Sequence, residues 1–193
     1  MTQPTLNVSP FPPLGWDSYF WTGEVVLPSW AGFQSRRGAY GAVNSRAASD
    51  GSARLTVTPQ SGDPPTPPVG EQARAFGLLL ENERAVADSV LRAILAAYPG
   101  LRDAYDYDEE EVAELMPDIE RAEQLRGLIG LSHVHVLNVA KDGIAYIGFE
   151  FGCTWDDEHG LGVMTHRGRV VEVGGADTSF LEWIAGQDAE SNE

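Results

Sequence analysis

The sequence has few of the residues that crosslink small proteins or anchor them in membranes. Among its 193 residues Cys153 is the single cysteine, which rules out an intrachain disulfide, a zinc ribbon and a CxxC redox motif. No apolar run approaches the roughly 18 residues that a membrane-spanning helix needs. Residues 1–15 lack the basic and apolar regions of a secretory signal. We therefore expect a cytoplasmic protein that makes no membrane contact.

Basic residues are also scarce. Lysine and arginine together number 13 against 29 aspartates and glutamates, and the formal net charge is −16. Acids and bases balance over residues 1–70, so the whole excess of negative charge lies in residues 71–193. A field of this sign repels nucleic acid and anionic lipid, and it attracts basic proteins. We expect a basic protein partner and no nucleic acid, while no pattern indicates the oligomeric state.

The first part of the chain reads as an arm followed by two strands. Residues 1–15 are rich in proline and predict an irregular N-terminal arm. Residues 19–27 and 52–58 are rich in aromatic and β-branched residues and predict strands. The proline-rich residues 59–70 predict a stiff crossover, because the region before them has too few strands to bury a core alone. The sequence thus predicts one domain over residues 16–185.

Two helical regions follow the crossover. In residues 71–98 apolar side chains return every three or four positions, and Pro99 and Gly100 are expected to end this helix. Residues 108–126 carry a second apolar stripe that Pro117 interrupts, which predicts two short helices or one kinked helix. One face of the helices in residues 71–126 is expected to be buried.

The last part of the chain has the period of strands. From Ser132 on, two pairs of strand-like segments are joined by loops that contain Gly143 and Gly168, which predicts an antiparallel meander over residues 132–175. Residues 186–193 are polar and are expected to be disordered. The predicted fold class is α+β, with an antiparallel sheet of about six strands and two to three helices packed on one face.

The strongest candidate for chemistry is a pair of histidines. Side chains alternate along a strand, so His133 and His135 share one face of it. If Ala140 pairs with Ile144, they face Phe151 and Phe149 and lie beside Cys153. Together with a carboxylate or histidine from the following hairpin, such a pair suits zinc or iron(II). The tentative metal ligands are His133, His135, Asp156 and His159, with Glu158 as a general base. The alternative is a pair of packed, hydrogen-bonded histidines.

The stretch Asp156-Asp157-Glu158-His159-Gly160 also has a purely structural interpretation. Aspartates cap turns with their side chains, and a glycine supplies a positive φ angle before the next strand. Its spacing matches neither HExxH nor the calcium-binding loop. The stretch therefore predicts either part of a metal site or the capped turn of a hairpin.

An acidic run extends from Asp106 to Glu123. A solvated helix face is one interpretation, and a docking surface for a basic protein is the other, with Glu109, Glu110, Glu111 and Glu114 as binding residues. The chain has no GxSxG, P-loop or GxGxxG motif. We expect a non-enzymatic protein-binding or immunity-type module with no cofactor. The alternative is a metal-dependent hydrolase or oxygenase, so the motifs leave enzymatic activity open.

Several stretches together resemble a known family. They are LPSWAGF at residues 27–33, AYIG at residues 145–148 and WDDEHGLGV at residues 155–163. These stretches resemble an uncharacterised bacterial family of domains of unknown function with a WDxEHGLGV motif. The resemblance implies a small cytosolic protein, with toxin and immunity genes as neighbours of some members. It implies no activity and no catalytic residue.

Overall fold

The structure, a computed structural model, describes residues 5–38, 42–61 and 65–191. Within these residues eight strands form one sheet in chain order, more than the six predicted. All neighbours pair antiparallel except the fourth and fifth strands, which are parallel. The strands are β1 (Thr5–Leu6), β2 (Leu14–Trp16), β3 (Trp21–Ala31), β4 (Asp50–Val57), β5 (Ile129–Lys141), β6 (Ile144–Cys153), β7 (Leu161–His166) and β8 (Arg169–Gly174).

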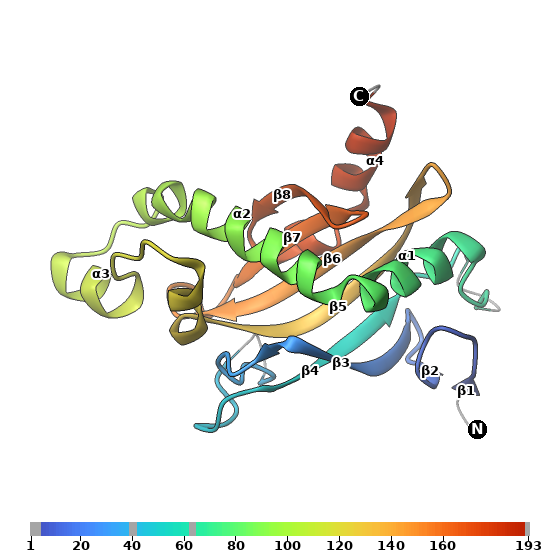
Figure 1. Cartoon of the computed structure of the whole chain (residues 1–193), viewed down its shortest axis with the longest axis horizontal. Coiled ribbons are helices and arrows are strands. Elements are labelled where there is room, and N and C mark those ends of the chain that lie inside the picture. Colours follow the sequence, from blue (N-terminus) through green and yellow to red (C-terminus); the bar gives the residue numbers. More distant parts are fainter. Residues whose placement is uncertain (1–4, 39–41, 62–64, 192–193) are drawn as a thin grey trace.

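The α+β class is confirmed, and α1 (Gly70–Glu81) and α2 (Glu83–Asp103) pack on one sheet face as expected, but a further helix that was not predicted covers part of the other face. In Figure 1, α1 and α2 cross in front of the sheet. On β6, Ala145 and Ile147 join the core beneath these helices, whereas Tyr146 between them packs with Ile184 of α4 (Glu182–Glu190). Because alternate strand residues point to opposite faces, α4 lies on the face opposite α1 and α2.

The predicted helix of residues 71–98 is two helices. Most of its apolar stripe is buried as expected, although Leu80 is 42% exposed. The helix breaks at Asn82, whose φ and ψ are −119° and 22°. Asparagine competes with helical hydrogen bonding through its side chain, and here the Asn82 amide donates to the carbonyl of Leu78 at 2.9 Å. Glu83 then accepts hydrogen bonds from the backbone N–H and the hydroxyl of Ser29. The break therefore ties the start of α2 to β3.

The helix end and the second helical region also differ in detail. α2 continues through Pro99 to Asp103. The proline ring removes one backbone hydrogen bond, but this loss falls near the end of a helix whose buried face still packs against the core, so the helix tolerates it. The region of residues 108–126 forms two short helices, α3 (Glu109–Leu115) and the 3-10 helix η2 (Ala122–Gly127), with Pro117 between them.

Both chain ends are more regular than the sequence predicts. Within the expected irregular arm, β1 and β2 extend the sheet beyond β3. The expected disordered tail, residues 186–193, contributes to α4 up to Glu190, and residues 192–193 lie outside the described ranges. Asp188 holds this helix to the sheet by accepting hydrogen bonds from Tyr146 and Arg169. These contacts between distant residues order a segment whose own composition is polar.

None of the helices in the described ranges has both the length and the apolar character that crossing a bilayer requires.

Candidate functional site

The histidine pair lies on the sheet face opposite α1 and α2. The rings of His133 and His135 stack with centroids 5.6 Å apart and an angle of 10° between their planes, as expected for side chains on one face of β5. Their side chains are 31% and 14% exposed, so both rings are mostly buried. Phe180, which follows the 3-10 helix η3 (Ala176–Ser179), contacts the His135 ring edge-on at 5.4 Å.

The register expected for β5 and β6 is wrong. Lys141, not Ala140, pairs with Ile144, and irregularities after Leu131 and Val136 shift the ladder again. His133 is consequently opposite Glu150, and His135 is opposite Gly148. The two phenylalanines expected beside the histidines, Phe149 and Phe151, are buried with Cys153 in the core that includes α1 and α2.

Glu150 is the centre of the histidine cluster. Its Oε2 lies 2.9 Å from His135 Nε2, and its Oε1 lies 3.3 Å from His133 Nδ1. The Thr56 hydroxyl lies 2.6 Å from His135 Nδ1. A carboxylate only accepts hydrogen bonds, so His135 donates from Nε2 to Glu150, and in its neutral form accepts from Thr56 at Nδ1. The His133 Nδ1 atom is buried and has no well-aligned hydrogen-bond partner among the described residues.

The charge states of the cluster follow from burial and proximity. Burial by itself would raise the pKa of Glu150, but the hydrogen bonds and charges of the two histidines outweigh it and lower the pKa to about 2. Burial lowers the pKa of His135, despite the opposing hydrogen bond and charge of Glu150. At neutral pH the cluster therefore combines an ionised carboxylate with a neutral His135.

This geometry offers no support for the predicted metal site. His135 forms a hydrogen bond with Glu150, a residue that the sequence did not place in this cluster. Asp156 and His159 are engaged with each other and with the backbone of their own turn. In the described ranges no group of three or more histidine, cysteine, aspartate or glutamate side chains is arranged to hold a metal ion.

The stretch from Asp156 to Gly160 is the capped turn of the β6–β7 hairpin. The Oδ1 atom of Asp156 accepts hydrogen bonds from the backbone N–H groups of Glu158 and His159 at 3.1 and 2.7 Å. Gly160 has a φ of +61°, in the left-handed region. The His159 side chain is 76% exposed, and Glu158 is exposed as well. The structural interpretation of this stretch is thus confirmed.

The same turn anchors the acidic segment, which we define as residues 106–123. Tyr105, just before the segment, donates its hydroxyl hydrogen to Asp156 Oδ2 at 2.7 Å. Tyr107 donates to the carbonyl of Trp155 at 2.5 Å, and the Thr154 hydroxyl donates to the carbonyl of Leu115 at 2.5 Å. Met116 is fully buried. The segment is therefore attached firmly to the end of β6.

The carboxylates of the acidic segment all face solvent. α3 has no buried residue and lies at one end of the molecule, at the left in Figure 1. Asp108 caps its first turn by accepting from the N–H groups of Glu110 and Glu111, both at 2.9 Å. The predicted binding residues are exposed on this helix: Glu109, Glu110, Glu111 and Glu114. The other exposed acids of the segment are Asp106, Asp108, Asp118, Glu120 and Glu123.

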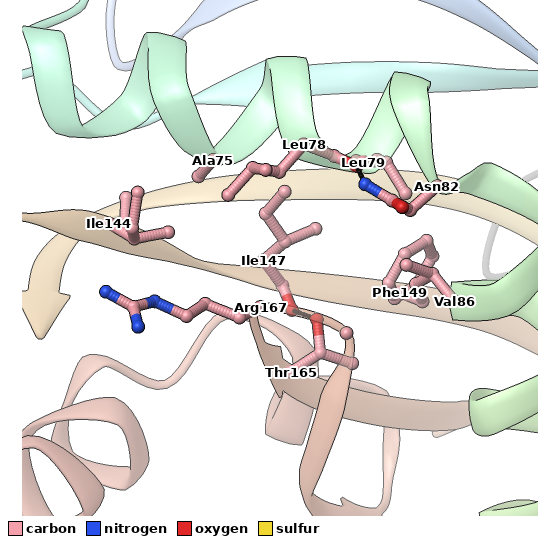
Figure 2. A pocket seen from close by; sticks show the side chains of 12 residues that line it. Ala75, Leu78, Leu79, Asn82, Val86, Ile144, Ile147, Phe149, Thr165 and Arg167 are labelled. Atoms are coloured by element: carbon pink, nitrogen blue, oxygen red, sulfur yellow. Dashed lines mark hydrogen bonds between the residues drawn. The ribbon is translucent and has the colours of Figure 1, made fainter.

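A cavity of about 200 Å³ lies elsewhere, between the α1–α2 break and strands β6 and β7. In Figure 2, Ala75, Leu78 and Leu79 point from α1 toward Ile147. Arg167, in the β7–β8 turn, extends beside Ile144 at one end. Most of the wall is apolar, and the polar side chains that line it are Asn82, Thr165 and Arg167.

Sequence reasoning missed two important residues. Glu150 had a local signal, because a carboxylate between Phe149 and Phe151 in a buried strand needs a partner. Arg167 had none, because only the packing of the helix break against the hairpin makes the cavity that it lines.

A family model described as a domain of unknown function, DUF6985, matches residues 40–181. The match includes the acidic segment, the histidine cluster and the capped turn. No curated protein and no solved structure matches the chain.

Proposed function

The chain belongs to the family of the domain of unknown function DUF6985, and we propose that it is a non-enzymatic binding protein that docks a basic protein through the acidic segment. The observation that carries this proposal is a short helix that exposes all four of its glutamates while the segment around it is attached to the core. α3 has no buried residue, yet hydrogen bonds from Tyr105, Tyr107 and Thr154 attach the segment around it to the core.

Rigid attachment distinguishes this segment from a merely solvated acidic stretch. Leu115 of α3 and the rings of Tyr105 and Tyr107 pack, partly buried, against the core, in addition to the three hydrogen bonds. A preformed surface loses less conformational entropy on binding, which favours affinity. The anchored segment thus presents its carboxylates from a backbone that is attached to the core.

The negative charge of the acidic segment favours a basic protein as the partner. Clustered carboxylates attract an oppositely charged surface over a Debye length and accelerate encounter at low salt. Within the segment only Arg121 is basic against nine acids. Arg102, which lies outside the segment, forms an ion pair with Asp118. An immunity-type module in a bacterium, which blocks a basic protein by covering its functional surface, is the form of binding protein that we favour.

The experiment compares two variants with the same loss of charge. The acidic variant carries Glu109→Gln, Glu110→Gln, Glu111→Gln and Glu114→Gln. The control carries four exposed substitutions outside the segment: Glu81→Gln, Asp88→Asn, Glu172→Gln and Glu182→Gln. Proteins retained from a lysate of the source cells are identified, and the affinity of each purified basic protein is measured at several salt concentrations.

The proposal expects a basic protein that the wild type and the control bind equally and that the acidic variant binds at least tenfold more weakly, with affinity falling as salt rises. Equal binding by the two variants, or binding that salt leaves unchanged, would rule out docking through the acidic segment.

A further inference from the structure

We propose that the cavity between the α1–α2 break and strands β6 and β7 binds a small apolar molecule that carries one carboxylate, with Arg167 as the partner of that carboxylate. Its volume of about 200 Å³ exceeds the roughly 150 Å³ of an apolar cavity that takes up benzene. The cavity is therefore large enough for a small ligand.

The helix break creates the space. Because the helix turns at Asn82, Leu78 and Leu79 at the end of α1 and Val86 at the start of α2 line the cavity from two directions. Leu78 keeps 36% of its surface exposed although it lines the wall, so the cavity communicates with solvent beside it. A ligand could enter there without unfolding of the sheet.

The chemistry of the wall selects an apolar ligand body. Eight of the lining side chains are apolar: Ala75, Leu78, Leu79, Val86, Ile144, Ala145, Ile147 and Phe149. The two uncharged polar side chains already have partners. Thr165 donates to the carbonyl of Ile147 at 2.8 Å, and Asn82 donates to the carbonyl of Leu78 at 2.9 Å. A sugar or another polyhydroxyl ligand would find too few free hydrogen-bonding groups here.

One end of the cavity selects a negative charge. Among the residues that line it, Arg167 is the only charged one, so the wall carries no carboxylate although the chain has a net charge of −16. The Arg167 side chain is 48% exposed. Its Nη2 atom donates a hydrogen bond to the backbone carbonyl of Asp142 at 3.1 Å and lies 3.9 Å from Asp142 Oδ2. Such a long, solvated ion pair contributes little. Because a guanidinium has five N–H donors, it can make a bidentate contact with a ligand carboxylate in place of that ion pair.

The volume limits the length of the ligand. About 200 Å³ corresponds to roughly seven water molecules in the liquid, which fits a chain of about eight carbons better than a long lipid. Octanoate is therefore a suitable probe, and 1-octanol has the same chain without the charge. Octylammonium has the opposite charge.

The experiment titrates the full chain with each probe and follows backbone amide shifts by NMR. Octanoate is expected to shift residues that line the cavity and to bind about tenfold more tightly than 1-octanol, as one charge-assisted contact implies. Octylammonium is expected to bind more weakly still. Arg167→Gln should weaken octanoate about tenfold and leave 1-octanol unchanged.

A filling variant tests the location. Ala75→Leu extends a buried side chain into the cavity and is expected to abolish binding of octanoate, whereas Ala85→Leu, at an exposed position on α2 outside the wall, is expected to leave it unchanged. Equal affinity for octanoate and 1-octanol would overturn the carboxylate assignment. Absence of shifts at the cavity up to millimolar octanoate would overturn the site, and Arg167→Gln keeps the test valid if Ala75→Leu fails to fold.

Discussion

The hydroxyl of Tyr105 donates a hydrogen bond to Asp156 Oδ2 at 2.7 Å, and this bond connects the acidic segment to the β6–β7 turn. The other oxygen of the same carboxylate caps that turn. Burial would raise the pKa of Asp156, but these hydrogen bonds outweigh burial and lower it. Asp156 thus has two structural roles, both of which depend on its ionised form.

Removal of this bond should cost measurable stability. We expect Tyr105→Phe to lower the free energy of unfolding by about 1.5 kcal/mol, because hydrogen bonds to charged groups contribute about 1.5–3 kcal/mol. Asp156→Ala should cost more, since it leaves the turn N–H groups without their acceptor. Urea denaturation measures both effects. Tyr19→Phe, at a side chain that is 75% exposed, is the control and should change stability by less than about 0.5 kcal/mol. A Tyr105→Phe variant as stable as this control would contradict the anchoring role.

Stability should fall as the pH is lowered from 7.5 to 5. Burial lowers the pKa values of His135 and His166 below about 6.5, the value of an unfolded histidine. The unfolded chain then binds more protons than the folded chain, so the stability that is present above pH 6.5 is lost below it. Thermal unfolding over a pH series measures the slope.

His135→Gln should reduce that slope and leave the part due to His166. A slope that His135→Gln does not alter would show that His135 is not a neutral buried group.

Cys153 should be unreactive in the folded protein. Burial raises the pKa of its thiol to about 12, so almost no thiolate exists at pH 8. We expect a thiol-labelling reagent to react at least a hundredfold more slowly with the native chain than with the chain in urea. Rapid labelling under native conditions would contradict the burial of Cys153.

Burial likewise raises the pKa of Tyr98 to about 12. Because the pKa values of both Cys153 and Tyr98 are raised in the folded chain, the stability that these groups contribute is complete at neutral pH and is lost as the pH rises above about 9.

Gly148 should tolerate no side chain. A Cβ atom built on it would lie 1.6 Å from the carbonyl oxygen of Ser179, a backbone atom of η3. Gly148→Ala is therefore expected to destabilise the fold by more than about 3 kcal/mol, through displacement of the backbone that covers this face. Gly186→Ala is the matched control, because nothing lies near the added methyl group in α4. It should increase stability by about 0.5–1 kcal/mol as measured in urea. Comparable losses in the two variants would disprove the close approach.

Local patterns predicted much of the fold and part of the candidate site. Residues 129–174 form four antiparallel strands, as their strand-forming residues and glycine-containing turns predict. The capped turn at Asp156 and the exposure of Glu109 were likewise readable from neighbouring residues. The break at Asn82 had a local signal as well, because asparagine disfavours the interior of a helix. The apolar stripe that runs on both sides of Asn82 nevertheless predicted one continuous helix.

The sequence by itself determined most strands and helices between residues 19 and 175, the capped hairpin turn and where the negative charge is exposed, since these depend on residues within a few positions of one another. Only the tertiary structure decided that β4 lies parallel to β5, that Glu150 lies opposite His133, and that α4 is ordered by Tyr146. It also decided that a cavity remains beside Arg167. The physical reason is that ladder irregularities, crossovers and gaps between packed elements depend on partners far apart in the chain, and no local period encodes which of these partners meet.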